Sequence, residues 1–194
     1  MGESWDQYAE GWDTDEDVVL FSEKAYRTLI EIVDPKGLSI LDFGCGTGLL
    51  TERMAATASR VLALDASQKM IAVLSNKQLP NVDVLSAELT EEIIKENNLF
   101  HSKFDLIVAS SVCAFLPDYE RSLKLLKSLL IPNGMFVQWD WLKSNDDVDF
   151  GITEEAIQSA FLNAGLKVLS ISKAFSLKST ESLMHVLMGV VKNA

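Results

Sequence analysis

A glycine-rich turn after a short apolar run constrains the fold of this chain more than any other feature. Residues 38–43 are mostly apolar, residues 44–48 read Gly-Cys-Gly-Thr-Gly, and a helical pattern begins near Thr47. A buried strand that passes through a tight turn into a helix has this pattern. Glycine permits positive φ angles and lets a ligand come close to the backbone, whose amides can then face it. We therefore predict a strand, a turn and a helix, with a ligand site at the turn.

The spacing of these glycines separates the possible ligands. A dinucleotide fingerprint, Gly-x-Gly-x-x-Gly, would have its third glycine at position 49, where this chain has Leu49. The Gly-x-x-x-x-Gly-Lys-Ser/Thr phosphate loop is also absent. A purely structural turn would need only one or two glycines. The spacing therefore disfavours a nicotinamide-dependent oxidoreductase, and it favours a ligand role over a structural one.

An acidic residue followed by Gly-x-Gly-x-Gly resembles motif I of the class I S-adenosylmethionine-dependent methyltransferases. Residues 104–108, Phe-Asp-Leu-Ile-Val, are similar to a second motif of that family, and the resemblance runs from about Trp5 to Lys192. It implies an α/β fold: a Rossmann-like, doubly wound, seven-stranded sheet, mostly parallel, with one antiparallel strand in a C-terminal hairpin and helices on both faces. It also implies S-adenosyl-L-methionine as the cofactor. The motif I positions expected to bind it are Asp42, Gly44, Cys45, Gly46, Thr47 and Gly48.

The length of 194 residues fits a single domain. We divide residues 1–194 into an N-terminal helical arm or lid, residues 1–35, and a Rossmann-like core, residues 36–194. Hydrophobic periodicity and stop signals define the expected elements. Helices are expected at residues 16–33, 49–58, 67–77 and 118–130 and after Thr153, and strands at residues 38–43, 60–65, 82–86, 104–111, 135–140, 166–174 and 185–191.

Asp65 ends the second buried strand, about 20 residues beyond the glycines, where a carboxylate can accept hydrogen bonds from a ribose diol. A strand-terminal aspartate is also often the N-cap of the next helix. Together with the glycine turn, the spacing favours the cofactor role. The family resemblance implies the same role for Asp65, beside Ala66.

The expected adenine end of the site departs from the family pattern. Many relatives have Gly-Asp-Ala after the third strand, whereas this chain has Ser-Ala-Glu-Leu at residues 86–89. Glu88 could contact the adenine from one position along, or the backbone of Ala87 could do so. Alternatively, Glu88 begins the acidic first turn of the following helix. Ser110 should face the cofactor, because ligands bind at the carboxyl ends of parallel strands.

Three aromatic residues, Trp5, Tyr8 and Trp12, lie among acidic residues near the N-terminus and are expected on a short helix. Aromatic residues at this spacing often only dock an arm onto a core. In the methyltransferases that the chain resembles, such a segment folds over the bound cofactor. The resemblance therefore implies that Tyr8 and Trp12 form a lid.

The methyl acceptor and any catalytic base are less defined. Residues 1–20, 110–120 and 139–153 remain to shape an acceptor pocket, for a small molecule or for a surface completed by another chain. Asp140, between two tryptophans, and Asp118 are weak candidates for removing a proton. The Asn-Pro-Pro-Tyr signature of relatives that methylate planar amino groups is absent.

Composition limits the function further. A net charge of −11 argues against a nucleic-acid footprint. No apolar run reaches the roughly 18 residues of a membrane span. The acidic N-terminus lacks Lys and Arg before Lys24, unlike a targeting peptide, so we expect a cytoplasmic protein. Two histidines and two dispersed cysteines give no metal motif and suggest reduced thiols.

We therefore predict an enzyme that transfers a methyl group from S-adenosyl-L-methionine to an unidentified acceptor, most simply a small molecule. The alternative is a catalytically silent cofactor-binding module that regulates a protein partner.

Overall fold

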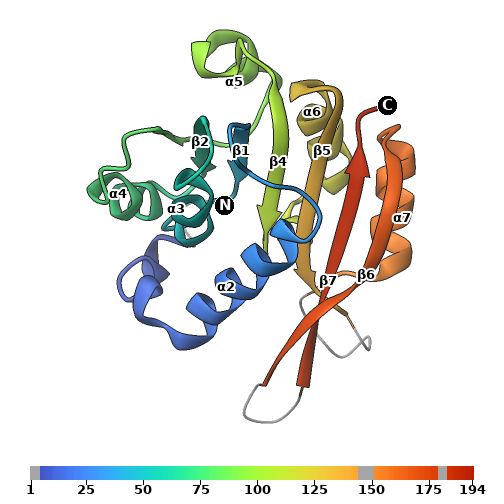
Figure 1. Cartoon of the computed structure of the whole chain (residues 1–194), viewed down its shortest axis with the longest axis horizontal. Helices are drawn as coiled ribbons and strands as arrows, with labels where there is room; N and C mark the ends of the chain where they lie inside the picture. Colours follow the sequence, from blue (N-terminus) through green and yellow to red (C-terminus); the bar gives the residue numbers. More distant parts are fainter. Residues whose placement is uncertain (1–4, 144–150, 179–182) are drawn as a thin grey trace.

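A mixed β-sheet forms the centre of the molecule. The computed structural model describes residues 5–143, 151–178 and 183–194, and within them the sheet has seven strands in the order β3-β2-β1-β4-β5-β7-β6. β7 runs antiparallel to β5 and β6, whereas the pairs from β3 to β5 are parallel (Figure 1). This arrangement confirms the expected fold class. The strands are β1 (Ser39–Phe43), β2 (Arg60–Asp65), β3 (Val82–Ser86), β4 (Phe104–Ser110), β5 (Leu130–Trp141), β6 (Lys167–Lys178) and β7 (Leu183–Lys192).

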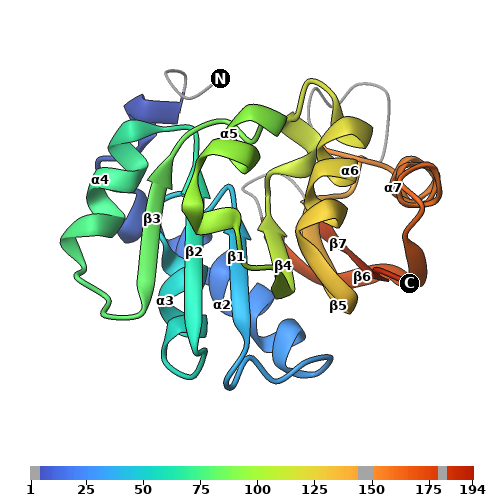
Figure 2. The same cartoon turned by 90° about the horizontal axis from the view of Figure 1, so that it is seen from above.

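Helices cover both faces of the sheet because strand side chains alternate between the faces. From β1, Ile40 packs with residues of α2 (Glu16–Ile30) and α3 (Leu49–Ala55), while Leu41 and Phe43 pack with residues of α6 (Tyr119–Leu129) and α7 (Glu154–Asn163). α4 (Gln68–Asn76) joins the first face and α5 (Glu91–Glu96) the second (Figure 2). Each fully buried aliphatic side chain contributes about 1.5–3 kcal/mol.

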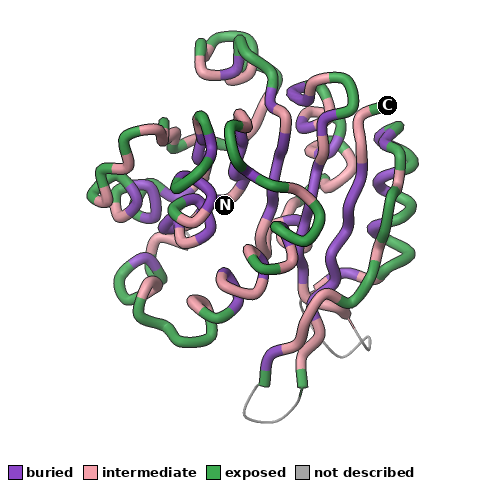
Figure 3. The backbone as a smooth tube through the Cα atoms, in the orientation of Figure 1, coloured by how far each residue is buried: buried purple, intermediate pink, exposed green. Residues whose placement is uncertain are grey.

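The central strands are buried along most of their length, as Figure 3 shows for β4, β5 and β7. Long apolar runs are typical of parallel strands with helices on both faces. The parallel strands place their carboxyl ends at one edge of the sheet. The strand order reverses between β1 and β4, and the crevice at such a reversal is the usual ligand position in these folds.

The N-terminal arm is less regular than expected. In its described part, Trp5 is helical and two 3-10 turns follow, η1 (Asp6–Tyr8) and η2 (Trp12–Thr14), so Trp5, Tyr8 and Trp12 do not share one short helix. Gly11 lies between them with φ of +87°. The following helix begins at the expected residue, with Asp15 as its N-cap, but ends at Ile30 rather than at residue 33.

The C-terminal part of the sheet is longer than expected. β5 begins at Leu130 instead of residue 135, and its register with β4 shifts between the pairs Phe104–Leu130 and Leu106–Met135. This irregularity accommodates Pro-Asn-Gly at residues 132–134, and the Asn133 amide donates to the carbonyl of Asn193, 2.6 Å away. Strands β6 and β7 form a hairpin that extends beyond the neighbouring strands (Figure 1). Among the described residues, no helix combines the length and hydrophobicity that a membrane crossing requires.

Candidate cofactor and acceptor site

A cavity of about 370 Å³ lies at the carboxyl ends of β1, β2, β3 and β4. Its walls include Asp42 and residues 44–47 after β1, Asp65 and Ala66 after β2, Ala87 and Glu88 after β3, and Ser110 at the end of β4. The cavity therefore brings together most of the residues expected to bind a cofactor. The expected residues outside its lining are Tyr8 and Gly48.

The glycine turn is tightly packed. Gly44 has φ of +72°, and a Cβ atom there would lie 2.3 Å from Cγ2 of Val112. Gly48 has φ of +85°, and its Cβ would lie 2.3 Å from Cδ1 of Leu74 on α4. Gly48 is also the N-cap residue of α3. Gly44 thus leaves room at the cavity, whereas Gly48 serves the packing of the helices behind it.

The amides of this turn mostly bind within the protein, so the expectation that they face a ligand freely is wrong for four of them. Gly44 and Cys45 both donate to the carbonyl of Leu64, at 2.7 and 3.1 Å. Gly46 donates to Oδ2 of Asp65 at 2.9 Å, and Gly48 donates to the carbonyl of Cys45 at 3.0 Å. These bonds tie the turn to the end of β2 and hold its shape.

Asp42 is buried on β1 with one carboxylate oxygen unsatisfied. Its Oδ2 accepts a hydrogen bond of 2.6 Å from Oγ1 of Thr51, while Oδ1 has no partner among the described residues. Burial raises the pKa of Asp42 to about 7, with a smaller contribution from the charge of Asp65, and the Thr51 bond opposes the rise. A buried acceptor without a partner is costly. A positively charged donor, such as the ammonium of an amino-acid ligand, fits this position.

Asp65 holds the turn and retains capacity for a ligand. Its Oδ1 accepts from the Ser67 amide at 2.7 Å, in addition to the Gly46 bond. Burial raises its pKa, and these amide bonds partly offset the rise. The N-cap of α4 is Ser67, not Asp65, so the capping alternative for Asp65 is wrong. The Ala66 amide also donates a hydrogen bond to this carboxylate. A carboxylate has about four acceptor positions, so capacity remains for a ribose hydroxyl.

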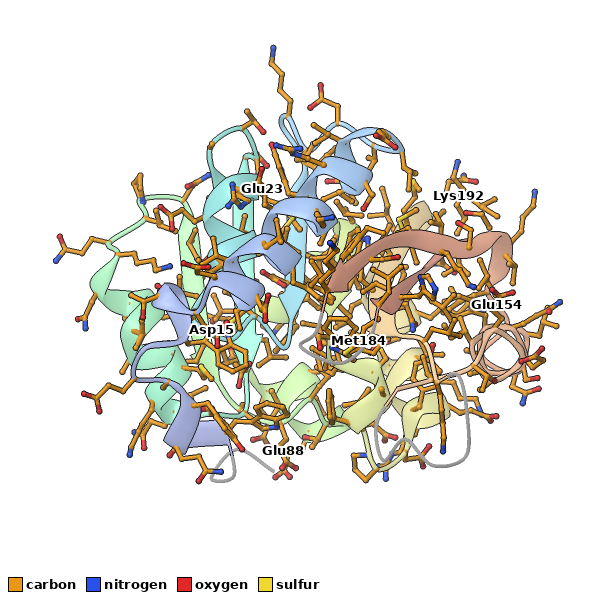
Figure 4. All side chains as sticks on the ribbon, turned by 90° about the horizontal axis from the view of Figure 1, so that it is seen from below. Asp15, Glu23, Glu88, Glu154, Met184 and Lys192 are labelled. Atoms are coloured by element: carbon orange, nitrogen blue, oxygen red, sulfur yellow. The ribbon has the colours of Figure 1, made fainter. Side chains whose placement is uncertain are left out.

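Glu88 lies at the exposed rim of the cavity, two residues beyond β3 (Figure 4). Helix α5 begins only at Glu91, with Thr90 as its N-cap, so Glu88 is not in the first turn of that helix. The Ala87 amide donates to the carbonyl of Asp65 at 3.0 Å and links the end of β3 to the end of β2.

The N-terminal arm forms an aromatic edge over the cavity. Trp12 lines it, and its Nε1 would lie 3.7 Å from a Cβ placed on Gly46. Trp5 also lines the cavity and meets Phe115 edge to face, at 5.3 Å between ring centroids. Tyr8 is 50% exposed and packs against both tryptophans from outside. Of the two expected lid residues, only Trp12 reaches the cavity.

Polar contacts anchor this arm to the core. Asp6 accepts hydrogen bonds from the Ser67 hydroxyl and the Lys69 amide at the start of α4. Asp13 accepts a hydrogen bond from the hydroxyl of Thr47 in the glycine turn and pairs with Lys77, 2.9 Å away. The arm is therefore fastened to elements that also carry the glycine turn and Asp65.

Neither candidate base lines the cavity. Asp140 is fully buried, where Oδ1 accepts from the Ala114 amide at 3.0 Å and Oδ2 from Nε2 of Gln138 at 2.9 Å. Burial raises its pKa to about 7, and these bonds oppose the rise. Asp118 is the N-cap of α6. Both carboxylates therefore support the segment between β4 and α6, and neither is placed to take a proton from a molecule in the cavity.

Sequence reasoning missed part of the wall. Phe21 and Ser22 of α2 line the cavity, although they lie outside the segments expected to shape an acceptor pocket. Within those expected segments, residues 1–4 and 144–150 are not described. The signal was the helical spacing of Phe21 from Asp17, which lines the cavity as well. Trp141 lines the cavity, whereas its neighbour Trp139 is core and donates to Oγ1 of Thr28. Ser111 has φ of +58° in the cavity wall, an uncommon conformation for a residue other than glycine.

Comparison with known proteins agrees with this geometry. A family model described as "Methyltransferase domain" matches residues 41–136, from β1 into β5. A S-adenosylmethionine-dependent methyltransferase from Aquifex aeolicus superposes with a TM-score of 0.75 at 18% identity, covering 97% of this chain and 98% of that one. A methyltransferase domain model thus matches nearly half of the chain, and the fold as a whole is that of S-adenosylmethionine-dependent methyltransferases. A putative methyltransferase of Haloferax volcanii, solved with the Trm112 methyltransferase activator, gives a TM-score of 0.80 at 15% identity, with 99% and 96% coverage.

Curated relatives match this chain over a shorter stretch than the solved structures do. An uncharacterized methyltransferase of Schizosaccharomyces pombe is 30% identical over 116 residues, which is 57% of this chain and 41% of the relative. A ubiquinone biosynthesis O-methyltransferase of Coxiella burnetii is 31% identical over 102 residues, 51% of this chain and 42% of the relative. The chain thus spans about two fifths of the length of these relatives.

Proposed function

We propose that this chain transfers a methyl group from S-adenosyl-L-methionine to a small-molecule acceptor. The observation that carries the proposal is the pair of carboxylates at adjoining strand ends in one cavity, the buried Asp42 and the half-buried Asp65. Asp42, with its unsatisfied Oδ1, suits the ammonium of the methionine end, and Asp65 suits the ribose. Cofactors of this kind are held by charge-assisted hydrogen bonds at these positions.

The remaining contacts follow from the order of the strand ends. Residues 44–47 line the methionine end, Ala66 adjoins the ribose, and Ala87 and Glu88 take the adenine. Ser110 lies toward the reacting end, and Trp12 covers the glycine turn with Tyr8 behind it. Gly48 acts indirectly, by holding α3 and α4 together.

The chemistry needs alignment more than acid or base groups. The bound cofactor supplies an electrophilic methyl group on a sulfonium sulfur. The protein must orient the acceptor lone pair along the bond that breaks and exclude water. Trp5, Trp12 and Phe115 form an apolar cover that can exclude water.

A small-molecule acceptor agrees with the net charge of −11 and with the names of the relatives, such as ubiquinone biosynthesis O-methyltransferase. We place the protein in the cytoplasm, because Cys45 and Cys113 are both free thiols. A cofactor-binding module that regulates a partner is the second candidate. It is favoured by the likeness to the Haloferax volcanii methyltransferase that was solved with an activator protein.

Calorimetric titration with S-adenosylhomocysteine tests the proposal. We expect the native chain to bind it, and Asp65→Ala to weaken binding by roughly 1–3 kcal/mol through the loss of a charged hydrogen-bonding partner. Asp83→Ala, which removes an exposed carboxylate on β3 that pairs with Arg60, should bind normally. NADH should not bind. No binding of S-adenosylhomocysteine by the native chain would refute the proposal. Binding without methyl transfer to any acceptor would favour the regulatory module.

A further inference from the structure

Part of the cavity wall is not needed for the cofactor. It comes from α2, from residues 111–117 and from Trp141. On α2, Asp17 and Phe21 are four residues apart and therefore lie on one face of the helix. The ring of Phe21 packs against that of Trp141, with centroids 5.1 Å apart. A carboxylate thus lies one helical turn from a pair of aromatic rings in the same wall.

All charged side chains in the described lining of the cavity are acidic. Asp17, Asp42, Asp65 and Glu88 line the cavity, and its described lining contains no Lys, Arg or His. The lysine of α2 that follows Phe21, Lys24, turns away and donates to the carbonyl of Ser176 at 3.1 Å. An acceptor with a carboxylate or phosphate would lose water without gaining a cationic partner, which costs several kcal/mol. The lining therefore selects against anionic acceptors.

Asp17 distinguishes a cationic acceptor from a neutral one. In the proposed site, Asp42, Asp65 and Glu88 serve the ammonium, the ribose and the adenine of the cofactor. Asp17 remains. It is exposed, and its side chain forms no hydrogen bond or ion pair with other described residues. Aromatic faces attract cations, most strongly those of tryptophan. A carboxylate one helical turn from Phe21, whose ring packs against Trp141, therefore matches a cation carried on an apolar body.

We propose that the acceptor is a small amine with an apolar body, whose nitrogen lies toward Asp17 and whose body lies against Phe21 and Trp141. This inference rests on the proposed function. The ammonium form is recruited from solution and loses its proton to water at the exposed rim. The nitrogen lone pair then forms a bond to the methyl carbon while the carbon–sulfur bond breaks. The electron pair stays on sulfur, which gives S-adenosylhomocysteine and an N-methylated ammonium product.

Three probes that share a phenylethyl group and differ in their terminal group test the acceptor class: 2-phenylethylamine, 2-phenylethanol and 3-phenylpropionate. Formation of S-adenosylhomocysteine from S-adenosylmethionine reports methyl transfer, and calorimetry on the protein saturated with S-adenosylhomocysteine reports acceptor binding. We expect the amine to bind at least tenfold more tightly than the carboxylate or the alcohol, and it alone to be methylated. Asp17→Asn should raise KM for the amine about tenfold and leave S-adenosylhomocysteine binding unchanged. Glu16→Gln removes the adjacent exposed carboxylate, which lies outside the lining, and should change neither quantity.

The two proposals fail differently. If S-adenosylhomocysteine does not bind the native chain, the proposed function fails and this inference falls with it. If it binds, but the alcohol or the carboxylate binds the saturated protein as well as the amine does, the inference alone is overturned. Equal amine affinity in Asp17→Asn and in the native chain would overturn it too.

Discussion

At the scale of single residues, the unsatisfied Oδ1 of Asp42 couples cofactor binding to pH. The pKa of Asp42 is about 7 without ligand, and a cationic ammonium beside it would lower that pKa. The bound state then holds fewer protons, so we expect S-adenosylhomocysteine binding near pH 6.5 to release a proton and to weaken as pH falls below 7. Calorimetry in two buffers of different ionisation enthalpy measures this release. Asp42→Asn should abolish it, and Asp140→Asn, outside the cavity, should retain it. Proton uptake on binding would contradict this assignment.

Gly44 permits a second prediction at the same scale. Gly44→Ala places a methyl group 2.3 Å from Cγ2 of Val112 at a φ of +72°. We expect it to lower the free energy of unfolding by about 1–3 kcal/mol and to abolish S-adenosylhomocysteine binding. Gly37→Ala is the matched control, because Gly37 has φ of +74° but no atom within 4 Å of the added Cβ. Urea denaturation measures the free energy of unfolding of both variants. Adding Val112→Ala to Gly44→Ala should recover part of the lost stability. Equal losses for both glycines would show that backbone strain alone matters.

At the scale of elements, the N-terminal arm should control how fast the ligand leaves. Asp13 links the arm to Thr47 and to Lys77. Asp13→Asn weakens this link, and a partly exposed ion pair contributes up to about 1 kcal/mol. We therefore expect dissociation of S-adenosylhomocysteine to become about three- to fivefold faster, with a smaller change in association. Stopped-flow measurement of tryptophan fluorescence can follow this through Trp5 and Trp12. Glu10→Gln, on the same arm but outside the lining, should leave the rate unchanged; a similar rate increase there would assign the effect to net charge.

The elements also show which parts of the fold local sequence can predict. β2 and β3 match the expected bounds because an apolar run with polar ends defines a short buried strand. The start of β5 was missed because residues 132–134 carry strong turn signals, and hydrogen bonds between residues 130–134 and the distant Asn193 keep this segment in the sheet. The glycine turn and Asp65 follow from local spacing. By contrast, the helical spacing of Phe21 from Asp17 indicates only that they share a face of α2, whereas the place of that face in the cavity wall depends on how α2 docks beside Trp141.

At the scale of the whole molecule, two buried carboxylates should reverse the usual dependence of stability on pH. Asp42 and Asp140 both have a pKa raised by burial to about 7. Below about pH 4 each is protonated in both the folded and the unfolded state, so neither affects stability. Between about pH 4 and 7 the unfolded chain ionises them while the folded chain does not, which costs up to about 1.4 kcal/mol per pH unit for each group. Above pH 7 the cost is constant.

We therefore expect the free energy of unfolding of the ligand-free protein to fall by a few kcal/mol between pH 5 and 7.5, as urea denaturation at fixed ionic strength would measure. Asp42→Asn and Asp140→Asn should each reduce this slope, and together they should reduce it further, because the sites carry separate polar networks. Asp65, whose pKa is also raised by burial, should account for part of the slope that remains. Saturation with S-adenosylhomocysteine should remove only the contribution of Asp42 to this pH dependence, since a cation beside Oδ1 makes ionisation of that carboxyl favourable. A stability that rises over this range would mean that both carboxylates are ionised in the folded state. In that case Asp42 would not need the ammonium of the cofactor to stabilise its charge.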